Sequence, residues 1–192
     1  SGVITCADPT AREAQVYTPL AYGDGWPKAP DYRTPAWTLA TGGRGTVVHD
    51  FDGDEISEFA VSSANHYSAY ERDVSLVWSA DVDDSSGWAA GTAFDFLGDG
   101  TAEAMYADQG HLYAFDAEGG VLMDVPRGSP TLTEYPTVAD IDNDGSAEIL
   151  VVSTGQNQPT VQAIRDVEDR WIQARRIWNQ HTYHGTNVRE DG

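Results

Sequence analysis

Residues 138–152 have the sequence VADIDNDGSAEILVV, in which two apolar segments flank a loop with acidic residues at alternate positions. With Asp140 as position 1, carboxylates occupy positions 1, 3, 5 and 9, and Gly145 occupies position 6. A hard cation takes about six to eight oxygen ligands at roughly 2.3–2.6 Å. Alternate carboxylates and a backbone carbonyl at position 7 supply such oxygens, and the glycine permits a sharp bend. The stretch predicts a cation-binding loop with these ligands: Asp140, Asp142, Asp144, Ser146 and Glu148.

This loop differs from an EF-hand, which has a bidentate glutamate at position 12 and a helix on either side. Position 12 here is Val151, and both flanks are rich in β-forming residues. The flanks therefore predict strands.

The same pattern occurs in two earlier stretches, DFDGDEISE at residues 50–58 and DFLGDGTAE at residues 95–103. First positions fall at 50, 95 and 140, a constant spacing of 45 residues. A fixed period of this size is typical of propellers and solenoids, which repeat one supersecondary unit. The three stretches are called loop 50–58, loop 95–103 and loop 140–148 below.

Short segments rich in β-forming residues fill the chain between the loops, at about four per period, which predicts one propeller blade per repeat. The predicted strands are residues 11–17, 36–40, 46–51, 58–63, 67–72, 75–80, 88–96, 103–108, 111–116, 121–125, 137–141, 148–153, 160–166 and 171–178.

The sequence predicts an all-β fold of β-propeller-type blades, each with four short antiparallel strands, in a single domain over residues 1–192. Its predicted parts are a partial blade at 1–45, repeats at 46–90, 91–135 and 136–178, and a closing segment at 179–192. The chain is long enough for about four blades, and propellers close with four to eight, so two alternatives stay open. One is a compact propeller closed by its own termini, and the other is a partial propeller completed by other chains.

Over roughly residues 45–178 the chain resembles the FG-GAP repeats, also called VCBS repeats, of integrin-α-type propellers and secreted bacterial proteins. In that family this loop joins the first two strands of a blade and holds calcium. The resemblance implies a strong Ca²⁺ site in loop 140–148 and a second in loop 50–58, where Glu55 stands in place of the expected glycine. The second site would use Asp50, Asp52, Asp54, Ile56 and Glu58.

The middle loop departs from the family pattern, because Leu97 replaces the carboxylate at position 3. We expect this third site to be weaker or empty. Its remaining candidate ligands are Asp95, Asp99, Thr101 and Glu103.

The charge balance is strongly acidic, with 31 Asp and Glu against 11 Lys and Arg and a formal net charge of −20. This field repels nucleic acid and anionic membranes, so neither is an expected partner. The simplest interpretation is that the acidic charge keeps the protein soluble in a salty or extracellular medium. Bound calcium would neutralise only part of it.

The sequence contains one cysteine, Cys6, so no disulfide can form within the chain. It contains no run of 18 apolar residues, so membrane insertion is not expected. Because calcium is abundant outside cells and loops of this kind are filled there, we expect a secreted or cell-surface protein.

The repeat pattern ends in RRIWNQHTYHGTNV at residues 175–188, the densest polar and aromatic cluster of the chain. Four interpretations stay open: a cap on the last blade, a sugar- or peptide-binding surface, a transition-metal site at the two histidines, and catalysis. The candidate ligand-binding residues are Trp178, Asn179, His181, Tyr183 and His184.

Two functions follow. The first is a non-catalytic, calcium-binding extracellular module for adhesion, ligand recognition or self-assembly, with other protein chains or carbohydrate as partners. The alternative is a scaffold or part of a calcium-dependent polysaccharide lyase, with Arg175, Arg176, His181 and Tyr183 lining its groove. The sequence has no nucleophile-elbow, P-loop or HExxH motif.

Overall fold

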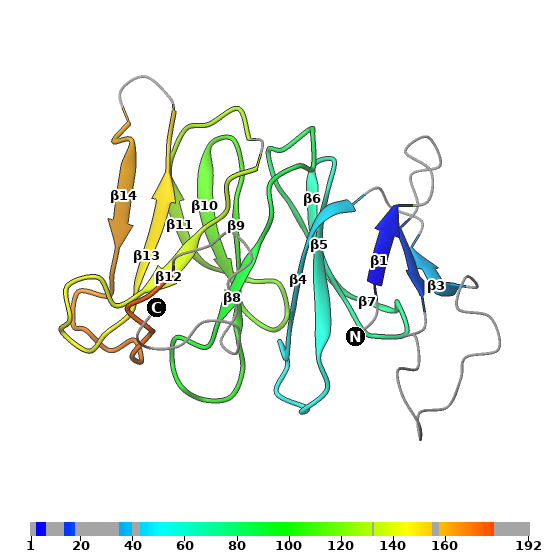
Figure 1. The fold of residues 1–192 in the computed structure, drawn as a ribbon, viewed down its shortest axis with the longest axis horizontal. Helices are drawn as coiled ribbons and strands as arrows, with labels where there is room; N and C mark the ends of the chain where they lie inside the picture. Colours follow the sequence, from blue (N-terminus) through cyan, green and yellow to red (C-terminus); the bar gives the residue numbers. More distant parts are fainter. Residues whose placement is uncertain are drawn as a thin grey trace.

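The computed structural model describes residues 3–6, 14–17, 35–39, 43–131, 133–154 and 158–178, with side chains from residue 46 onward. In these ranges the fold is all-β, as predicted, and fourteen strands form four antiparallel sheets. Figure 1 shows the sheets side by side in chain order, from β1–β3 at the right to β12–β14 at the left.

Each sheet is a meander in which every strand pairs with the next one in sequence. The first sheet contains β1 (Val3–Cys6), β2 (Ala14–Tyr17) and β3 (Pro35–Leu39). The second contains β4 (Gly43–His49), β5 (Glu58–Ser63), β6 (His66–Tyr70) and β7 (Leu76–Asp81). The third contains β8 (Thr92–Phe94), β9 (Glu103–Ala107), β10 (His111–Phe115) and β11 (Val121–Pro126). The fourth contains β12 (Thr137–Ala139), β13 (Glu148–Val152) and β14 (Val161–Ile164).

The second and third sheets have the four antiparallel strands expected of a blade, and each predicted cation loop joins the first two strands of its sheet. The fourth sheet has three strands among the described residues. The predicted strand at residues 171–178 is therefore wrong. Its backbone pairs elsewhere, because Ile172 N–H donates to the carbonyl of Phe96 in loop 95–103, at 2.8 Å.

The predicted strand at residues 46–51 also needs correction, since β4 begins at Gly43. Its pairing with β5 runs from Gly43 opposite Ser63 and shifts register between Gly43 and Thr46. Gly43 and Gly45 thus belong to an irregular strand start. Glycine tolerates the backbone of a bulge better than other residues do.

The hydrophobic core lies between neighbouring sheets. One cluster joins the second and third sheets, where the Tyr67 and Tyr106 rings stack with centroids 4.6 Å apart. The other joins the third and fourth sheets and includes Met105, Leu112 and Ile149. Strands β5 and β9 are buried along their whole length, and both contribute to the core between the second and third sheets.

A buried carboxylate, Asp84, connects the second sheet to its neighbour. It is 0% exposed and accepts hydrogen bonds from Tyr106 Oη on β9 at 2.6 Å and from Thr131 Oγ1 at 3.0 Å. It also accepts from the N–H and hydroxyl of Ser86, at 2.9 and 2.6 Å, and from Gly87 N–H at 3.0 Å. Burial alone would raise the pKa of Asp84, but these hydrogen bonds outweigh it and hold that pKa below its usual value.

We predict that Asp84→Asn lowers the unfolding free energy at pH 7 by about 3 kcal/mol or more, because donors on three segments lose a charged acceptor. The folded-state pKa of Asp84 is depressed. Its stabilisation is therefore full above the unfolded-state pKa of about 3.9 and is lost as pH falls through the folded-state value. Urea unfolding from pH 7 to pH 2.5 should show the wild-type advantage shrinking below about pH 4. Asp83→Asn, at the exposed neighbouring residue, is the control, and an equal effect of the two changes would contradict the assignment.

Candidate metal centres

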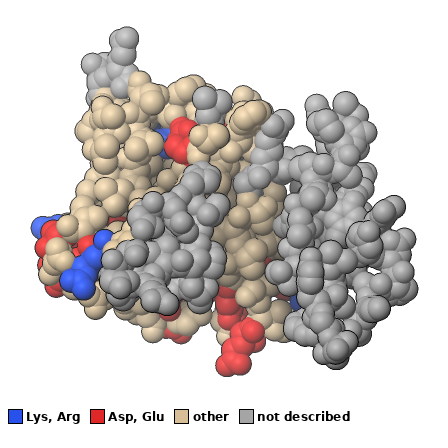
Figure 2. All heavy atoms as spheres, in the orientation of Figure 1, with Lys and Arg blue, Asp and Glu red and all other residues tan. Residues whose placement is uncertain are grey.

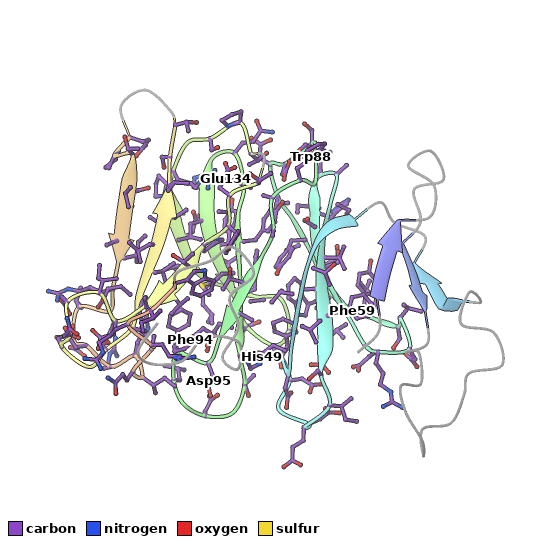
Figure 3. All side chains as sticks on the ribbon, in the orientation of Figure 1. His49, Phe59, Trp88, Phe94, Asp95 and Glu134 are labelled. Carbon is purple, nitrogen blue, oxygen red and sulfur yellow. The ribbon has the colours of Figure 1, made fainter. Side chains whose placement is uncertain are left out.

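All three loops lie at the same end of the sheets, the lower end in Figure 1. Figure 3 shows Asp95 at this end and Trp88 and Glu134 at the opposite end. Neighbouring loops are connected, since Ala102 N–H in loop 95–103 donates to the carbonyl of Asp50 at 3.1 Å. The predicted carboxylates therefore share one end of the molecule.

The glutamate at position 9 closes each loop in the same way. The N–H of position 2 donates to an Oε2 atom across the loop: Phe51 to Glu58 at 2.7 Å, Phe96 to Glu103 at 2.9 Å, and Ile141 to Glu148 at 2.8 Å. Each glutamate is the first residue of the second strand of its sheet. This position holds the carboxylate beneath the loop. The recurrence of this bond shows that the three loops have one backbone design.

The left-handed backbone conformation also recurs, at positions 4 and 6 of every loop. Glycine occupies four of these six places, and the exceptions are Asn143 at φ 63° and Glu55 at φ 68°. Asparagine tolerates this region, whereas for glutamate it costs roughly 1–2 kcal/mol. The loop shape thus persists in loop 50–58 even though Glu55 replaces the expected glycine.

The aspartate at position 5 sets the orientation of position 7 in each loop. Its Oδ1 accepts the N–H of position 7, as from Ile56 to Asp54 at 2.7 Å, from Thr101 to Asp99 at 3.0 Å and from Ser146 to Asp144 at 2.8 Å. These short-range turns fix the backbone around the carbonyl predicted to bind a cation.

Two of the loops gather carboxylate oxygens into clusters. The oxygens of Asp50, Asp52 and Glu58 lie within 4.8 Å of one another, and so do those of Asp140, Asp142 and Glu148. Two oxygens bound to one Ca²⁺ are separated by at most about 5 Å. The spacing of both clusters therefore fits a single hard cation.

The same two loops also contain buried carboxylate oxygens that have no hydrogen-bond partner. Glu58 is 1% exposed, Glu148 2% and Asp140 2%, yet Glu58 Oε1, Glu148 Oε1 and Asp140 Oδ1 have no donor. A buried charged group left unpaired costs more than about 1–3 kcal/mol. One divalent cation in each loop would supply the missing partners, for Glu58 in loop 50–58 and for Asp140 and Glu148 in loop 140–148.

The electrostatics agree with this interpretation. Burial raises the pKa of Glu58 and of Glu148, the N–H donor at position 2 opposes the rise, and the neighbouring aspartates add to it. Because both folded-state values are raised, the contribution of these glutamates is most favourable below the unfolded-state pKa of about 4.3 and is lost as pH rises through the folded-state pKa. Converging carboxylates thus weaken the fold at neutral pH without a counter-ion.

Loop 95–103 has the same backbone but no such cluster among the described residues. Asp95 accepts N–H groups of Gly98 at 2.6 Å, Asp99 at 3.2 Å and Gly100 at 2.9 Å, so position 1 is oriented as a ligand would be. The exposed Leu97 side chain occupies position 3, where the other two loops carry an aspartate. The sequence-based distinction between two complete loops and one incomplete loop is reproduced by the geometry.

The segment 165–178 runs across this end of the molecule and joins loop 95–103 to loop 140–148. The Trp171 ring packs on Phe96 with centroids 4.5 Å apart, and its carbonyl accepts Ser146 Oγ at 3.1 Å. Asp140 N–H donates to the carbonyl of Arg175 at 3.2 Å, and Ala174 is buried in the core. We call residues 165–178 the strap. Sequence analysis assigned part of it to a strand and missed its contact with the loops.

The predicted cluster at the carboxyl end lies mostly outside the described residues. Trp178 is partly buried, with its ring 6.1 Å from that of Tyr135, and Arg176 donates to Asn143 Oδ1 of loop 140–148 at 3.3 Å. The structure therefore places Arg176 beside a candidate metal centre. Asn179, His181, Tyr183 and His184 lie beyond the described ranges, so the cap, sugar, metal and lyase interpretations stay predictions.

We predict that Trp171→Ala lowers the unfolding free energy by about 3–5 kcal/mol, because it removes the aromatic contact that holds the strap against loop 95–103. Val167→Ala is the matched control in the strap, since Val167 is 88% exposed and should change stability by less than about 0.5 kcal/mol. Chemical denaturation in chelator measures both. Similar values for the two variants would contradict the structural role of the strap.

Comparison with known proteins finds a similar fold in a biofilm matrix protein and assigns no family. No known family and no curated protein matches the sequence. Among solved structures, the chain is similar to the biofilm matrix protein Bap1 of V. cholerae, with a TM-score of 0.63 and 25% identity over 71% of this chain. The match spans 24% of the length of Bap1. A protein of unknown function from Bacteroides caccae matches 80% of this chain and 54% of its own, at 12% identity and a TM-score of 0.40. In the described part of the chain no helix has the length and hydropathy needed to span a membrane.

Proposed function

We propose that this chain is a non-catalytic, extracellular adhesion or matrix module of the FG-GAP type, held together by Ca²⁺ in loop 50–58 and loop 140–148. The observation that carries the proposal is the coincidence, in the same two loops, of a carboxylate cluster and a buried glutamate oxygen without a donor. The similarity to the Bap1 matrix protein supports the extracellular role. Its partners would be other protein chains or carbohydrate.

The donor set favours Ca²⁺ over softer metals. Each cluster offers carboxylate oxygens and no cysteine or histidine, and hard cations prefer such ligands. Asp50, Asp52, Asp54 and Glu58 would hold one ion, with the carbonyl of Ile56. Asp140, Asp142, Asp144 and Glu148 would hold the other, with the carbonyl of Ser146. When bound, calcium supplies positive charge that lets the carboxylates converge, and the residues keep their loop shape around it.

The ion would act by stabilising the native state. A ligand that binds only the folded chain adds about 2.7 kcal/mol at a hundredfold excess over Kd. For a domain of this size that corresponds to a rise in Tm of about 5–10 °C for each filled loop. The loops sit at the junctions of successive sheets, so the gain would reach the whole fold.

We predict that calorimetric titration of the full chain gives two equivalents of Ca²⁺ and that Tm rises between chelator and millimolar calcium. Asp142→Ala should abolish one equivalent and about half of the rise in Tm, because it removes a ligand from a complete cluster. Asp99→Ala, at position 5 of the incomplete loop, is the control and should leave both quantities near wild type. The assignment of the loops fails if the two variants lose calcium-dependent stability equally.

The incomplete loop gives a second prediction. Leu97→Asp restores a carboxylate at position 3 of a loop whose backbone matches the other two and whose Asp95 accepts N–H groups of positions 4 and 6 as Asp50 does. We expect a third equivalent of Ca²⁺ and a further rise in Tm. Leu97 is 61% exposed, so the change should not disturb the core. Leu97→Ser serves as the control. A count of two equivalents in both variants would show that Leu97 does not limit binding at this loop.

A further inference from the structure

A basic residue that the sequence analysis did not single out lies against the carboxylates of loop 140–148. Arg165 follows β14 directly, and its Nη1 lies 3.8 Å from Asp142 Oδ2 and 3.8 Å from Asp144 Oδ2. These two residues occupy positions 3 and 5 of the loop. Figure 2 shows basic and acidic side chains together at the lower left, the end of the fourth sheet where the loop and the strap meet.

Arg165 faces the oxygens that the loop itself leaves available. Asp142 Oδ1 accepts the N–H of Asp144 at 3.1 Å, and Asp144 Oδ1 accepts the N–H of Ser146 at 2.8 Å. The remaining oxygen of each carboxylate, Oδ2, is the one that faces the guanidinium. Asp142 also belongs to the carboxylate cluster that fits a cation, so the guanidinium and the ion would share this side chain.

The two buried carboxylates of the loop, Asp140 and Glu148, have no such counter-ion among the described residues. Asp140 Oδ1 and Glu148 Oε1 are buried and have no partner, so the guanidinium neutralises only the outer half of the site. A guanidinium is planar and needs direct contact with its acceptors, whereas Ca²⁺ is compact and reaches inner and outer oxygens together. Arg165 is therefore an incomplete substitute for the ion.

Loop 50–58 lacks this feature. In the described part of the chain, none of the ion pairs involves Asp50, Asp52 or Asp54. A second anchor for Arg165 also exists outside the loop, because its Nη1 lies 3.8 Å from Asp169 Oδ1 in the strap. The guanidinium can leave the loop carboxylates and keep a counter-ion.

We propose that Arg165 competes with the divalent cation for Asp142 and Asp144 and thereby lowers the cation affinity of loop 140–148. The inference rests on the proposed function. The sequence implies Ca²⁺ sites in both loop 140–148 and loop 50–58 without ranking their affinities, and the position of Arg165 distinguishes the two. With Arg165 in place, loop 50–58 fills first and loop 140–148 fills at higher calcium.

The test is calorimetric Ca²⁺ titration of the full chain carrying Asp52→Asn, which leaves loop 140–148 as the complete site, with and without Arg165→Gln. Two half-exposed ion pairs correspond to an increase in affinity of about three- to tenfold when they are removed. Arg170→Gln in the same background is the matched control. It makes the same change in charge in the same strap, but Arg170 pairs with Asp166 and Glu168 instead of loop carboxylates. We expect its affinity to stay within about twofold of the background.

Melting in chelator gives a second measurement. Without calcium, Arg165→Gln leaves Asp142 and Asp144 without their counter-ion, so its Tm should lie below that of the Asp52→Asn background. In saturating calcium this difference should close. Arg170→Gln loses a close pair with Asp166, so its Tm should differ from the background by the same amount with and without calcium. Both results support competition at the loop.

Equal affinities of Arg165→Gln and Arg170→Gln, or weaker binding by Arg165→Gln, would overturn the competition while leaving the calcium sites intact. Absence of calcium binding in the unmodified chain would instead overturn the proposed function, and the competition with it. The two failures are therefore distinguishable.

Discussion

The fold depends on one hydrogen bond that recurs every 45 residues, from the backbone N–H at position 2 of a loop to the buried glutamate at position 9. This bond joins the end of one strand to the start of the next and bends the chain back on itself. It also brings the glutamate under the loop, where the second oxygens of Glu58 and Glu148 have no hydrogen-bond partner. Loop 50–58 and loop 140–148 thus combine a strand connection with a candidate ion site.

The packing of the sheets follows from this repeat. Every loop lies at the same end, and the cores lie between the second and third sheets and between the third and fourth sheets, where β5 and β9 are buried. Polar residues connect the sheets away from the loops. Asp84 is the best example, because its carboxylate accepts hydrogen bonds both from Tyr106 on β9 and from Thr131. The core and this network together hold the three loops in fixed relation.

Much of this could be predicted from the sequence, because the information was local. Alternate carboxylates with a turn residue encode a loop, and the replacement at Leu97 encodes its incomplete copy. The strap could not be predicted in this way. Its apolar residues have the composition of a strand, but its backbone donor Ile172 pairs with Phe96, which is distant in sequence. The position of Arg165 is equally non-local, since it lies near Asp142 only because β14 pairs with β13.

The net negative charge of the chain limits which partners the proposed module can bind. Two bound Ca²⁺ ions would change the formal net charge from −20 to −16, because each adds two charges, so the chain would remain strongly acidic. The acids outside the loops still repel polyanions at distances within a Debye length of about 8 Å in physiological salt. Direct binding of an anionic polysaccharide would have to overcome this field. A neutral sugar or a protein partner with basic residues meets no such barrier, so the charge favours these as partners of the proposed module.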